Sequence, residues 1–368
     1  MSLSDWKEYK IADLVEIIFS GGTPNTKVNE YWNGSLLWLS SGETKNRYIN
    51  STEKTITESG AQNSSTRLAL SGDVVMASAG QGYTRGQVSF LNVNTFINQS
   101  VIAIRANEKL LDKKFLFYNL SNRYEELRAI SDSNSIRGSI TTKMVKSMTI
   151  NIPNLDTQKS IANVLSSIDD KIENNKKINH HLEQIALFIF NKHFGKAETT
   201  NKLGDFFPVI TGKKDANVAK GGKYPFFSCS QNISYTDNYS FDNKAILLAG
   251  NGDFNVKIYD GKFEAYQRTY VLIPNNDEQF GYLYYAIKHF LNDITSGYRG
   301  SVIKFITKGS IESFNIFMTD DKKVLSLFNI FVEKIASNNK EIQELVNFRD
   351  ALLPKLLSGE ISVNQATK

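Results

Sequence analysis

Cysteine, paired prolines and long apolar runs are what this chain lacks. One of its 368 residues is cysteine, which excludes a disulfide framework and a four-cysteine metal site. None of the six prolines are adjacent, so the Asn/Asp-Pro-Pro-aromatic loop of amino-methyltransferases is missing. No apolar stretch approaches the roughly 18 residues of a membrane helix, and the N-terminus MSLSDWKEYK has no apolar signal core. We therefore expect a cytoplasmic protein.

Signals of catalysis are also missing from the sequence. It contains no Gly-x-x-x-x-Gly-Lys-Ser/Thr phosphate loop, and Gly80-Gln81-Gly82 reads as a hairpin turn between two strands. The four histidines have no cysteine or carboxylate neighbours at metal-ligand spacing. We expect no catalytic residue, no metal site and no cofactor in this chain. The net charge of +5 permits nucleic-acid binding without demanding it.

The stretch Thr157–Phe194 has neither proline nor glycine and predicts one long helix. Its apolar residues repeat every seven positions, as in a coiled-coil seam. One row of this seam holds Ile161, Ile168, Asn175, Leu182 and Ile189, and the other holds Val164, Lys171, Ile178 and Ile185. Asp156 or Thr157 is expected to cap the start of the helix, and Gly195 to end it.

A second stretch, Asp321–Leu357, has the same period and predicts a partner helix. One row of its seam holds Phe328, Ile335, Ile342 and Arg349, and the other holds Phe331, Asn338, Leu345 and Leu352. An asparagine near the middle of each seam costs stability but fixes register and partner. We expect the two helices to pair as an antiparallel coiled coil. The simpler alternative is two ordinary surface helices in which these asparagines are merely tolerated.

The two halves of the chain share eight short features in the same order. Leu203 aligns with Leu14, Gly212 with Gly22, Phe226–Ser228 with Trp38–Ser40, Ala249–Gly252 with Ala79–Gly82, Tyr266–Thr269 with Asn98–Val101, Tyr282–Tyr285 with Phe115–Tyr118, Arg299–Val302 with Arg137–Ile140, and Ser313–Ile316 with Ser147–Ile150. Eight collinear matches indicate a tandem repeat of a globular domain followed by a long helix.

This repeat predicts an α+β fold with two mixed α/β domains. The expected bounds are 1–155 for the first domain, 156–195 for the first helix, 196–318 for the second domain, 319–360 for the second helix and 361–368 for a C-terminal tail. Strands are predicted at Leu36–Leu39, Gly72–Ala79, Gln87–Leu91, Gln99–Ile104 and Met148–Pro153. A short helix is predicted near Ile11–Phe19. Trp38, Phe226 and Phe227 are predicted to be core residues.

On these features the chain resembles the specificity subunit of type I restriction-modification systems, over essentially its whole length. The most specific segments are Ile150-Asn151-Ile152-Pro153 with Gln158, Ile161-Ala162, Leu165 and Ile168-Asp169-Asp170-Lys171-Ile172, then Leu352–Ile361, and the opening Trp6-Lys7, Ile11 and Ser20–Pro24. One departure is that the second helix is entered through Ile316–Asp321 without the family's usual proline and glutamine.

The resemblance implies that each globular domain is a target-recognition domain for one half of a bipartite, asymmetric DNA sequence. It implies that the helices act as a spacer and that the chain binds two methyltransferase subunits, which carry S-adenosylmethionine. It also implies that restriction and motor subunits join this complex, while the chain itself catalyses nothing.

Candidate DNA contacts are polar side chains on loops, because such groups reach phosphates and base edges. In the first domain they are Lys45, Arg47, Tyr48, Gln81, Tyr83, Arg85, Arg137, Ser139, Thr142 and Lys143. In the second domain they are Lys213, Lys214, Lys220, Lys223, Asn251, Lys257, Tyr298, Arg299, Ser301, Lys304 and Lys308. The alternative is that surface loops are simply polar.

Two other functions stay open at this stage. A coiled-coil adaptor or dimerisation protein would bind DNA no better than a weak, sequence-blind background. An enzyme with an unfamiliar site would turn over substrate as the isolated chain.

Overall fold

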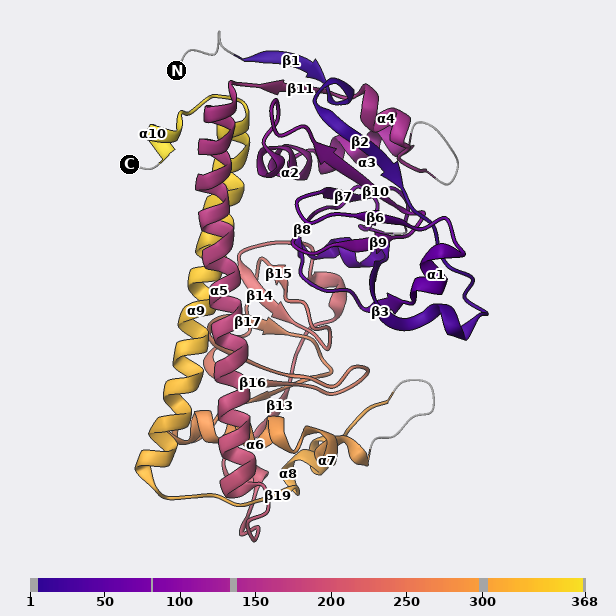
Figure 1. Ribbon diagram of the computed structural model, residues 1–368. Coiled ribbons are helices and arrows are strands. Elements are labelled where there is room, and N and C mark those ends of the chain that lie inside the picture. Colours follow the sequence, from indigo (N-terminus) through magenta and orange to yellow (C-terminus); the bar gives the residue numbers. More distant parts are fainter. Residues whose placement is uncertain (1–5, 81, 133–137, 298–303, 367–368) are drawn as a thin grey trace. The chain divides into compact units, whose positions relative to one another are not determined.

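A computed structural model describes residues 6–80, 82–132, 138–297 and 304–366 (Figure 1). The chain divides into two units. The first unit comprises residues 1–172 and 344–368, and the second comprises residues 173–343. Both long helices therefore contribute one part to each unit, whereas the sequence predicts a separate segment for each helix.

In its described residues the first unit contains two larger β-sheets and one two-stranded sheet, with short helices around them. Its strands are β1 Lys7–Lys10, β2 Val15–Ser20, β3 Trp32–Leu39, β4 Tyr48–Ile49, β5 Lys54–Ile56, β6 Arg67–Ala69, β7 Val74–Ala77, β8 Val88–Leu91, β9 Thr95–Ile97, β10 Val101–Ala106 and β11 Thr149–Ile152. Its short helices are η2 Ile11–Asp13, η3 Asn29–Tyr31, η4 Ser41–Lys45, α1 Glu58–Gln62, α2 Lys113–Ser121, α3 Tyr124–Asp132 and α4 Thr142–Ser147, and α10 Val363–Ala366 lies near the C-terminus.

The strand order is β2-β10-β7-β8-β4 in one sheet and β5-β3-β9-β6 in the other, and β1 pairs with β11. A core that includes Phe19, Leu39, Val75 and Ile97 is formed by strands of both sheets. The predicted strands are present, and Trp38 is buried. The predicted hairpin is confirmed, since β7 pairs antiparallel with β8.

The helix predicted near Ile11–Phe19 is wrong. Residues 11–13 form the single turn η2, and residues 15–20 form strand β2. The β-branched and aromatic residues Ile17, Ile18 and Phe19 favour a strand, and β10 supplies a partner that an isolated helix would not have.

The second unit repeats this plan with one larger sheet. Its strands are β12 Asn201–Lys202, β13 Val209–Thr211, β14 Tyr224–Phe227, β15 Ser234–Thr236, β16 Phe241–Ala249, β17 Val256–Ala265, β18 Thr269–Leu272 and β19 Asn315–Ile316. Its short helices are η5 Leu203–Asp205, η6 Ala216–Val218, η7 Asp277–Gln279, α6 Phe280–His289, α7 Leu291–Ser296 and α8 Lys308–Glu312. The sheet order is β13-β18-β16-β17-β14-β15, and β12 pairs with β19.

Backbone contacts refine the alignment of the two repeats. The N–H of Ile11 donates to the carbonyl of Met148, and the N–H of Leu203 donates to that of Phe314. Leu203 is therefore the counterpart of Ile11, not of Leu14. The helices α4 and α8 correspond as well, since Thr141 and Thr307 cap them in the same way.

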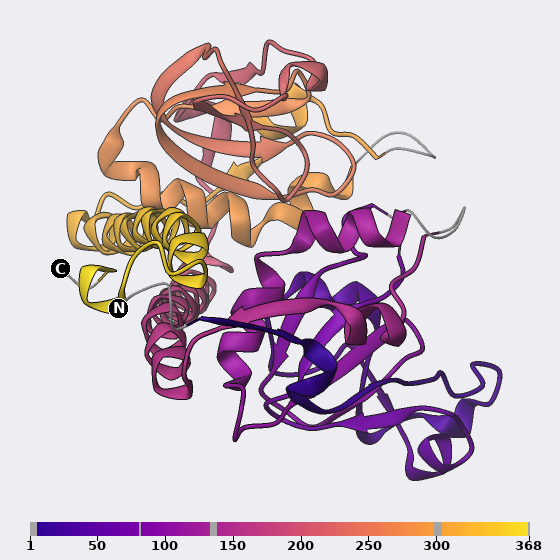
Figure 2. The ribbon, with the colours of Figure 1, turned by 90° about the horizontal axis from the view of Figure 1, so that it is seen from above.

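The long helices α5, Leu155–Phe194, and α9, Lys322–Leu357, pack together (Figures 1 and 2). In the second unit Asn175 contacts Glu341 at 2.9 Å and Asn179 contacts Asn338 at 2.7 Å. Residue numbers rise along α5 as they fall along α9, so the pair is antiparallel, as predicted. Helix α5 starts earlier than expected, because the side chain of Asn154 caps it by accepting from the N–H of Thr157.

The two predicted seam rows of α5 differ in burial. Ile161, Ile168 and Asn175 are buried, and Leu182 is half-buried. Ile178 and Ile185 expose 36% and 48% of their surface. The buried stripe runs instead through Leu165, Ile172, Ala186 and Phe190. Each half of α5 packs against both α9 and a globular domain, so its apolar face is wider than a two-row seam and turned toward the domain.

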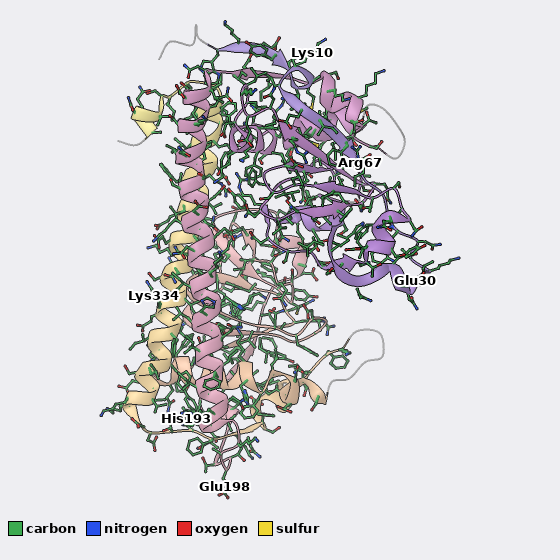
Figure 3. All side chains as sticks on the ribbon, viewed as in Figure 1. Lys10, Glu30, Arg67, His193, Glu198 and Lys334 are labelled. Carbon is green, nitrogen blue, oxygen red and sulfur yellow. The ribbon has the colours of Figure 1, made fainter. Side chains whose placement is uncertain are left out.

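On α9 the predicted seam residues Phe328 and Asn338 are buried, and Ile335, Ile342 and Leu345 are half-buried. Exposed polar residues of the two helices, such as Lys334 and His193, are labelled in Figure 3.

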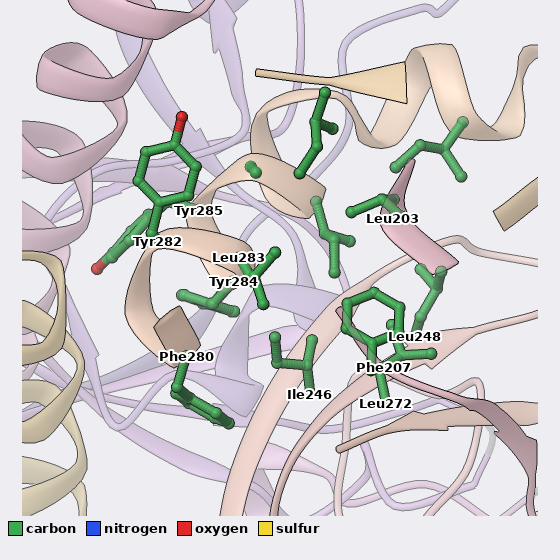
Figure 4. Packing of buried hydrophobic residues seen from close by; sticks show 14 of the residues in the cluster. Leu203, Phe207, Ile246, Leu248, Leu272, Phe280, Tyr282, Leu283, Tyr284 and Tyr285 are labelled. Atoms are coloured by element: carbon green, nitrogen blue, oxygen red, sulfur yellow. The ribbon is translucent and has the colours of Figure 1, made fainter. Parts of the chain in front are cut away.

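The core of the second unit forms where α6 meets the sheet and both long helices (Figure 4). Phe280 and Leu283 from α6 belong to one buried cluster with Ile246 and Leu272 from the sheet. Phe190 of α5 and Phe328 of α9 join that cluster, with their ring centroids 6.0 Å apart. The second domain is therefore fixed to both helices by aromatic packing.

Candidate nucleic-acid interface

In the first unit the glycine-rich turn after β7 lies beside the loop that enters α4. The N–H of Ile140 donates to the carbonyl of Ser78 at 2.9 Å. The guanidinium of Arg85 donates to the carbonyl of Gly138 at 2.9 Å and forms an ion pair with Asp132. These bonds hold two of the three predicted DNA-binding loops together.

The second unit pairs the corresponding loops. The N–H of Ile306 donates to the carbonyl of Gly250 at 3.0 Å, and the N–H of Gly252 donates to that of Lys304 at 2.9 Å. The phenol of Tyr270 donates to the carbonyl of Ile306 at 2.9 Å. We call these two sets of loops the paired loops. In the first unit they are residues 78–80 and 82–87 together with 138–143, and in the second unit they are residues 249–257 together with 304–308.

In each unit a turn between two strands lies beside the paired loops and beside one further loop. The turn joins β9 to β10 in the first unit and β17 to β18 in the second, and the further loop follows β2 in the first unit and β13 in the second. In the second unit the N–H of Gly250 donates to the carbonyl of Arg268, and the N–H of Gln267 donates to that of Lys214, both at 2.8 Å. In the first unit the N–H of Ser78 donates to the carbonyl of Ser100 at 2.8 Å. The neighbouring residue of that turn, Gln99, accepts from the hydroxyl of Thr23 through its side chain at 2.5 Å.

Glycine is required where this further loop crosses the turn. A Cβ atom on Gly212 would lie 2.1 Å from the carbonyl oxygen of Tyr266, and one on Gly21 would lie 1.8 Å from that of Ile97. Both contacts are far inside van der Waals distance. Gly21, rather than Gly22, is therefore the counterpart of Gly212.

Exposed side chains on these loops include a residue pair that the sequence analysis missed. Gln267 and Arg268 are exposed on the turn that adjoins the lysine-rich loop and the paired loops of the second unit. The sequence does contain a signal for these two residues, because the polar run Tyr266-Gln267-Arg268 lies between two apolar strands. In the sequence analysis this run was used only to align the repeats.

The predicted contact residues differ widely in exposure. Those that are exposed are Lys45, Tyr83, Ser139, Lys143, Lys213, Lys214, Lys220, Lys223, Lys304 and Lys308. Those that are half-buried are Arg47, Tyr48, Thr142, Asn251 and Lys257. Gln81, Arg137, Tyr298, Arg299 and Ser301 lie outside the described residues.

Arg85 and Lys257 do not fit the expectation that their charges face DNA. Arg85 is 8% exposed, and its guanidinium is engaged by Gly138 and Asp132. The ammonium of Lys257 donates to the carbonyl of Ser230 at 2.7 Å and to the side chain of Asn255. Burial lowers the pKa of this lysine. Both cations stabilise loops within their own unit.

Arg47 and Tyr48 likewise point inward, to Asp169 on α5. The Nε of Arg47 lies 2.9 Å, and the phenol oxygen of Tyr48 2.8 Å, from Oδ2 of Asp169. The guanidinium carbon of Arg47 also lies 4.7 Å from the ring centroid of Phe117. Sequence alone placed these residues on a DNA-facing loop because their carboxylate partner is 121 or more positions away.

The surroundings of Asp169 keep it ionised. Burial alone would raise the pKa of its carboxyl group, but the charge of Arg47 and the hydrogen bonds from Arg349, Arg47 and Tyr48 outweigh burial and lower the pKa. Burial, followed by the charge of Asp169, raises the pKa values of Tyr48 and Tyr118. Asp169 is therefore a carboxylate held by neutral phenols and two guanidinium groups.

The lysine-rich loop of the second unit presents its charges at the surface. Lys213, Lys214, Lys220 and Lys223 are all exposed. The ammonium of Lys213 lies 5.5 Å from the ring centroid of Phe241, and that of Lys223 lies 5.7 Å from the ring of Tyr224. Exposed lysines on a loop can contact phosphates without large rearrangement of the fold.

Neither a membrane span nor a clustered metal site is found in the part of the chain that the structure describes. Every helix there is too short or too polar to cross a bilayer. In the same residues, no group of three or more His, Cys, Asp or Glu side chains could hold a metal ion.

Comparison with known proteins identifies the family. A protein-family model described as "Type I restriction modification DNA specificity domain" matches residues 3–184 and, a second time, residues 197–347. The MjaIX specificity subunit of Methanocaldococcus jannaschii is 27% identical, with 98% of this chain and 94% of that protein aligned. The HindI specificity subunit of Haemophilus influenzae is 24% identical over 98% of this chain and 100% of that protein.

A solved structure shows the same fold. The S subunit of the type I restriction-modification system from M. genitalium superposes with a TM-score of 0.61 at 18% identity, covering 95% of this chain and 96% of that one. Two matches to one domain model, separated by the C-terminal end of α5, agree with the repeated domain and helix. The chain belongs to the family of DNA specificity subunits of type I restriction-modification systems.

Proposed function

We propose that this chain reads a bipartite, asymmetric DNA target, with one half-site for each globular domain. One observation supports this proposal. In both repeats the paired loops lie beside the turn between two strands, yet the exposed side chains of the first unit differ from those of the second. Gln99 and Tyr83 occupy this surface in the first unit, and Arg268 and Lys214 occupy it in the second. A common frame with different polar groups is suited to reading two different base sequences.

In this proposal the helix pair sets the spacing between the half-sites, since a two-part reader meets duplex DNA as two separated contacts. The chain recruits two methyltransferase subunits, which bring S-adenosylmethionine, and restriction and motor subunits join the complex. The chain supplies no catalytic group of its own and acts in the cytoplasm, where the DNA is.

Methylation mapping tests this function. The chain is expressed with its neighbouring methyltransferase, and the host DNA is sequenced for modified adenines. We expect a split motif with a fixed gap of unspecified bases. Replacing residues 1–155 by those of a homologue with another target should change one half of the motif and leave the other half and the gap unchanged.

The same experiment decides against the proposal if no split motif depends on this chain. Weak, sequence-blind DNA binding together with stable complex formation would then favour a coiled-coil adaptor.

A further inference from the structure

Asp169 of α5 receives four hydrogen bonds from three separate parts of the first unit. Arg349 of α9 donates at 2.7 Å, Tyr118 of α2 donates at 2.9 Å, and Arg47 and Tyr48, next to each other at the start of β4, donate at 2.9 and 2.8 Å. The side chain of Asp169 is 2% exposed. One buried carboxylate thus connects the recognition domain to both long helices.

A second polar contact joins the same domain to α5 near the point where the chain enters the helix. The side chain of Gln158 accepts from the N–H of Asp112 at 2.9 Å and donates to the carbonyl of Leu110 at 3.2 Å. Gln158 lies close to Ile152 and Pro153, where the domain is covalently attached. A domain held only at this end of the helix could still pivot about it.

Asp169 supplies the second fixed point. It is eleven residues beyond Gln158, or about 16 Å along the helix at about 1.5 Å per residue. The apolar residues between them, including Ile161 and Leu165, are buried but provide contacts that have no preferred direction. Hydrogen bonds to a carboxylate are directional, so they define an angle as well as a contact.

We infer that Asp169 is a positioning residue that fixes the angle of the first recognition domain on the helix pair, and with it the length of the gap that the protein accepts between its half-sites. This inference rests on the proposed bipartite recognition. Two guanidinium groups and two phenols converge on this one carboxylate, so the loss of Asp169 removes their shared acceptor and every directional bond that it makes.

A small change of angle is enough to affect the gap. One base pair advances the duplex by about 3.4 Å. With a lever of about 30 Å, roughly the diameter of a small domain, a tilt of about 7° moves the DNA-facing surface by that distance. A tilt of this size covers the axial step of one base pair. Each base pair also turns the half-site by about 34° about the duplex axis, at about 10.5 base pairs per turn, so a changed gap needs a domain that is free to turn as well as to tilt, and the bonds to Asp169 oppose both motions.

The test uses the full chain with its methyltransferase and a plasmid library in which the gap between the two half-sites varies by up to two base pairs.

Asp169→Asn removes the charge that Arg47 and Arg349 share. Tyr118→Phe removes one hydrogen bond to the carboxylate and keeps the ring, so it serves if Asp169→Asn does not accumulate. Asp170→Asn is the matched control for charge, because Asp170 is the exposed neighbour on the same helix. Val75→Ala is the control for stability, because Val75 is a core residue of the same unit that makes none of these bonds.

We expect Asp169→Asn to raise methylation of targets with a gap altered by one base pair about tenfold relative to the unsubstituted chain, with both half-site sequences unchanged. Tyr118→Phe should give a smaller rise, and the two controls should keep a single gap. The inference is overturned if the variants of Asp169 and Tyr118 keep the single gap, or if Val75→Ala relaxes it equally. Absence of any split motif with the unsubstituted chain would overturn the proposed function and this inference together.

Discussion

Arg349 of α9 donates a hydrogen bond of 2.7 Å from Nη1 to Oδ1 of Asp169 on α5, across 180 positions of sequence. The two side chains are 12% and 2% exposed. This bond links the two long helices within the first unit, and it places a buried negative charge between Arg349 and Arg47. Removing one member of such a cluster leaves the other charges uncompensated.

Asp169→Asn should therefore destabilise the chain by about 3 kcal/mol at neutral pH, the usual cost of breaking a buried ion pair. Urea denaturation of the chain in complex with its methyltransferase measures this destabilisation, with Asp170→Asn as the control. A destabilisation no larger than that of the control would contradict the prediction.

The same variant should change the response to acid. Because the folded state lowers the pKa of Asp169 below its unfolded value of 3.8, its stabilisation is complete well above that value. The stabilisation is lost as the pH falls through the lower, folded pKa. We therefore expect a constant difference in stability between the unsubstituted chain and Asp169→Asn from about pH 5 to 7, and a smaller difference below about pH 4. Unfolding at a series of pH values measures this difference. A difference that grows on acidification would show that Asp169 is not held as a carboxylate.

Replacing Asn338 by leucine should make the helix pair more stable but less specific in register. Asn338 is 2% exposed and donates to Asn179 at 2.7 Å. A leucine would add apolar burial worth about 1–2 kcal/mol, while removing the polar contact that selects one register. The measurement is the thermal unfolding midpoint, which should rise.

Asn174→Leu, on the exposed side of α5, is the matched control and should change the midpoint little. A lower midpoint for Asn338→Leu than for this control would mean that the hydrogen bond outweighs apolar burial.

Asn329 of α9 should contribute to stability as a cap for α6. Its side chain accepts from the N–H of Gly281 at 2.7 Å and donates to the carbonyl of Glu278 at 3.0 Å. Asn329→Ala should cost about 1 kcal/mol, as for other capping residues. Asn329→Asp keeps the acceptor and should cost less. Urea unfolding followed by far-ultraviolet circular dichroism would check this order, and equal costs would argue against capping.

Lys213 and Lys214 should contact phosphates rather than bases. If so, Lys213→Ala with Lys214→Ala weakens binding to all DNA sequences alike. It should also reduce the slope of log affinity against log salt concentration by about 1 for each phosphate that is no longer bound. Binding of the complex to duplex DNA at several salt concentrations measures this slope.

Lys334→Ala, on the exposed side of α9, is the control for net charge. A change of preferred half-site sequence, rather than of salt slope, would assign these two lysines to base recognition.

Much of the fold could be predicted because it is encoded locally. The period of the apolar residues predicted α5 and α9 nearly to the residue, and collinear matches predicted the repeat. Errors arose where a distant strand or side chain controls the outcome. Residues 15–20 form a strand because β10 lies beside them. Leu203 corresponds to Ile11 because each donates to the residue just before the strand that leads into a long helix.

In the candidate interface, too, local features could be predicted from the sequence and long-range contacts could not. Sequence analysis found the loops, since glycine and polar residues mark them, and it found most of their exposed lysines. It could not tell that Arg47 and Arg85 point inward, because their partners Asp169 and Gly138 are 122 and 53 positions away. It overlooked Arg268, which becomes a neighbour of Lys214 and Gly250 only through backbone contacts.

Periodicity, order and motif spacing are properties of the chain, so they were sufficient to establish the two repeats, the two long helices and the resemblance to a family. Folding was needed to establish which row of α5 is buried, which cations remain at the surface, and that Asp169 joins a recognition domain to both helices. Those outcomes depend on groups that only folding brings within hydrogen-bonding distance, and on burial that makes each unpaired charge costly.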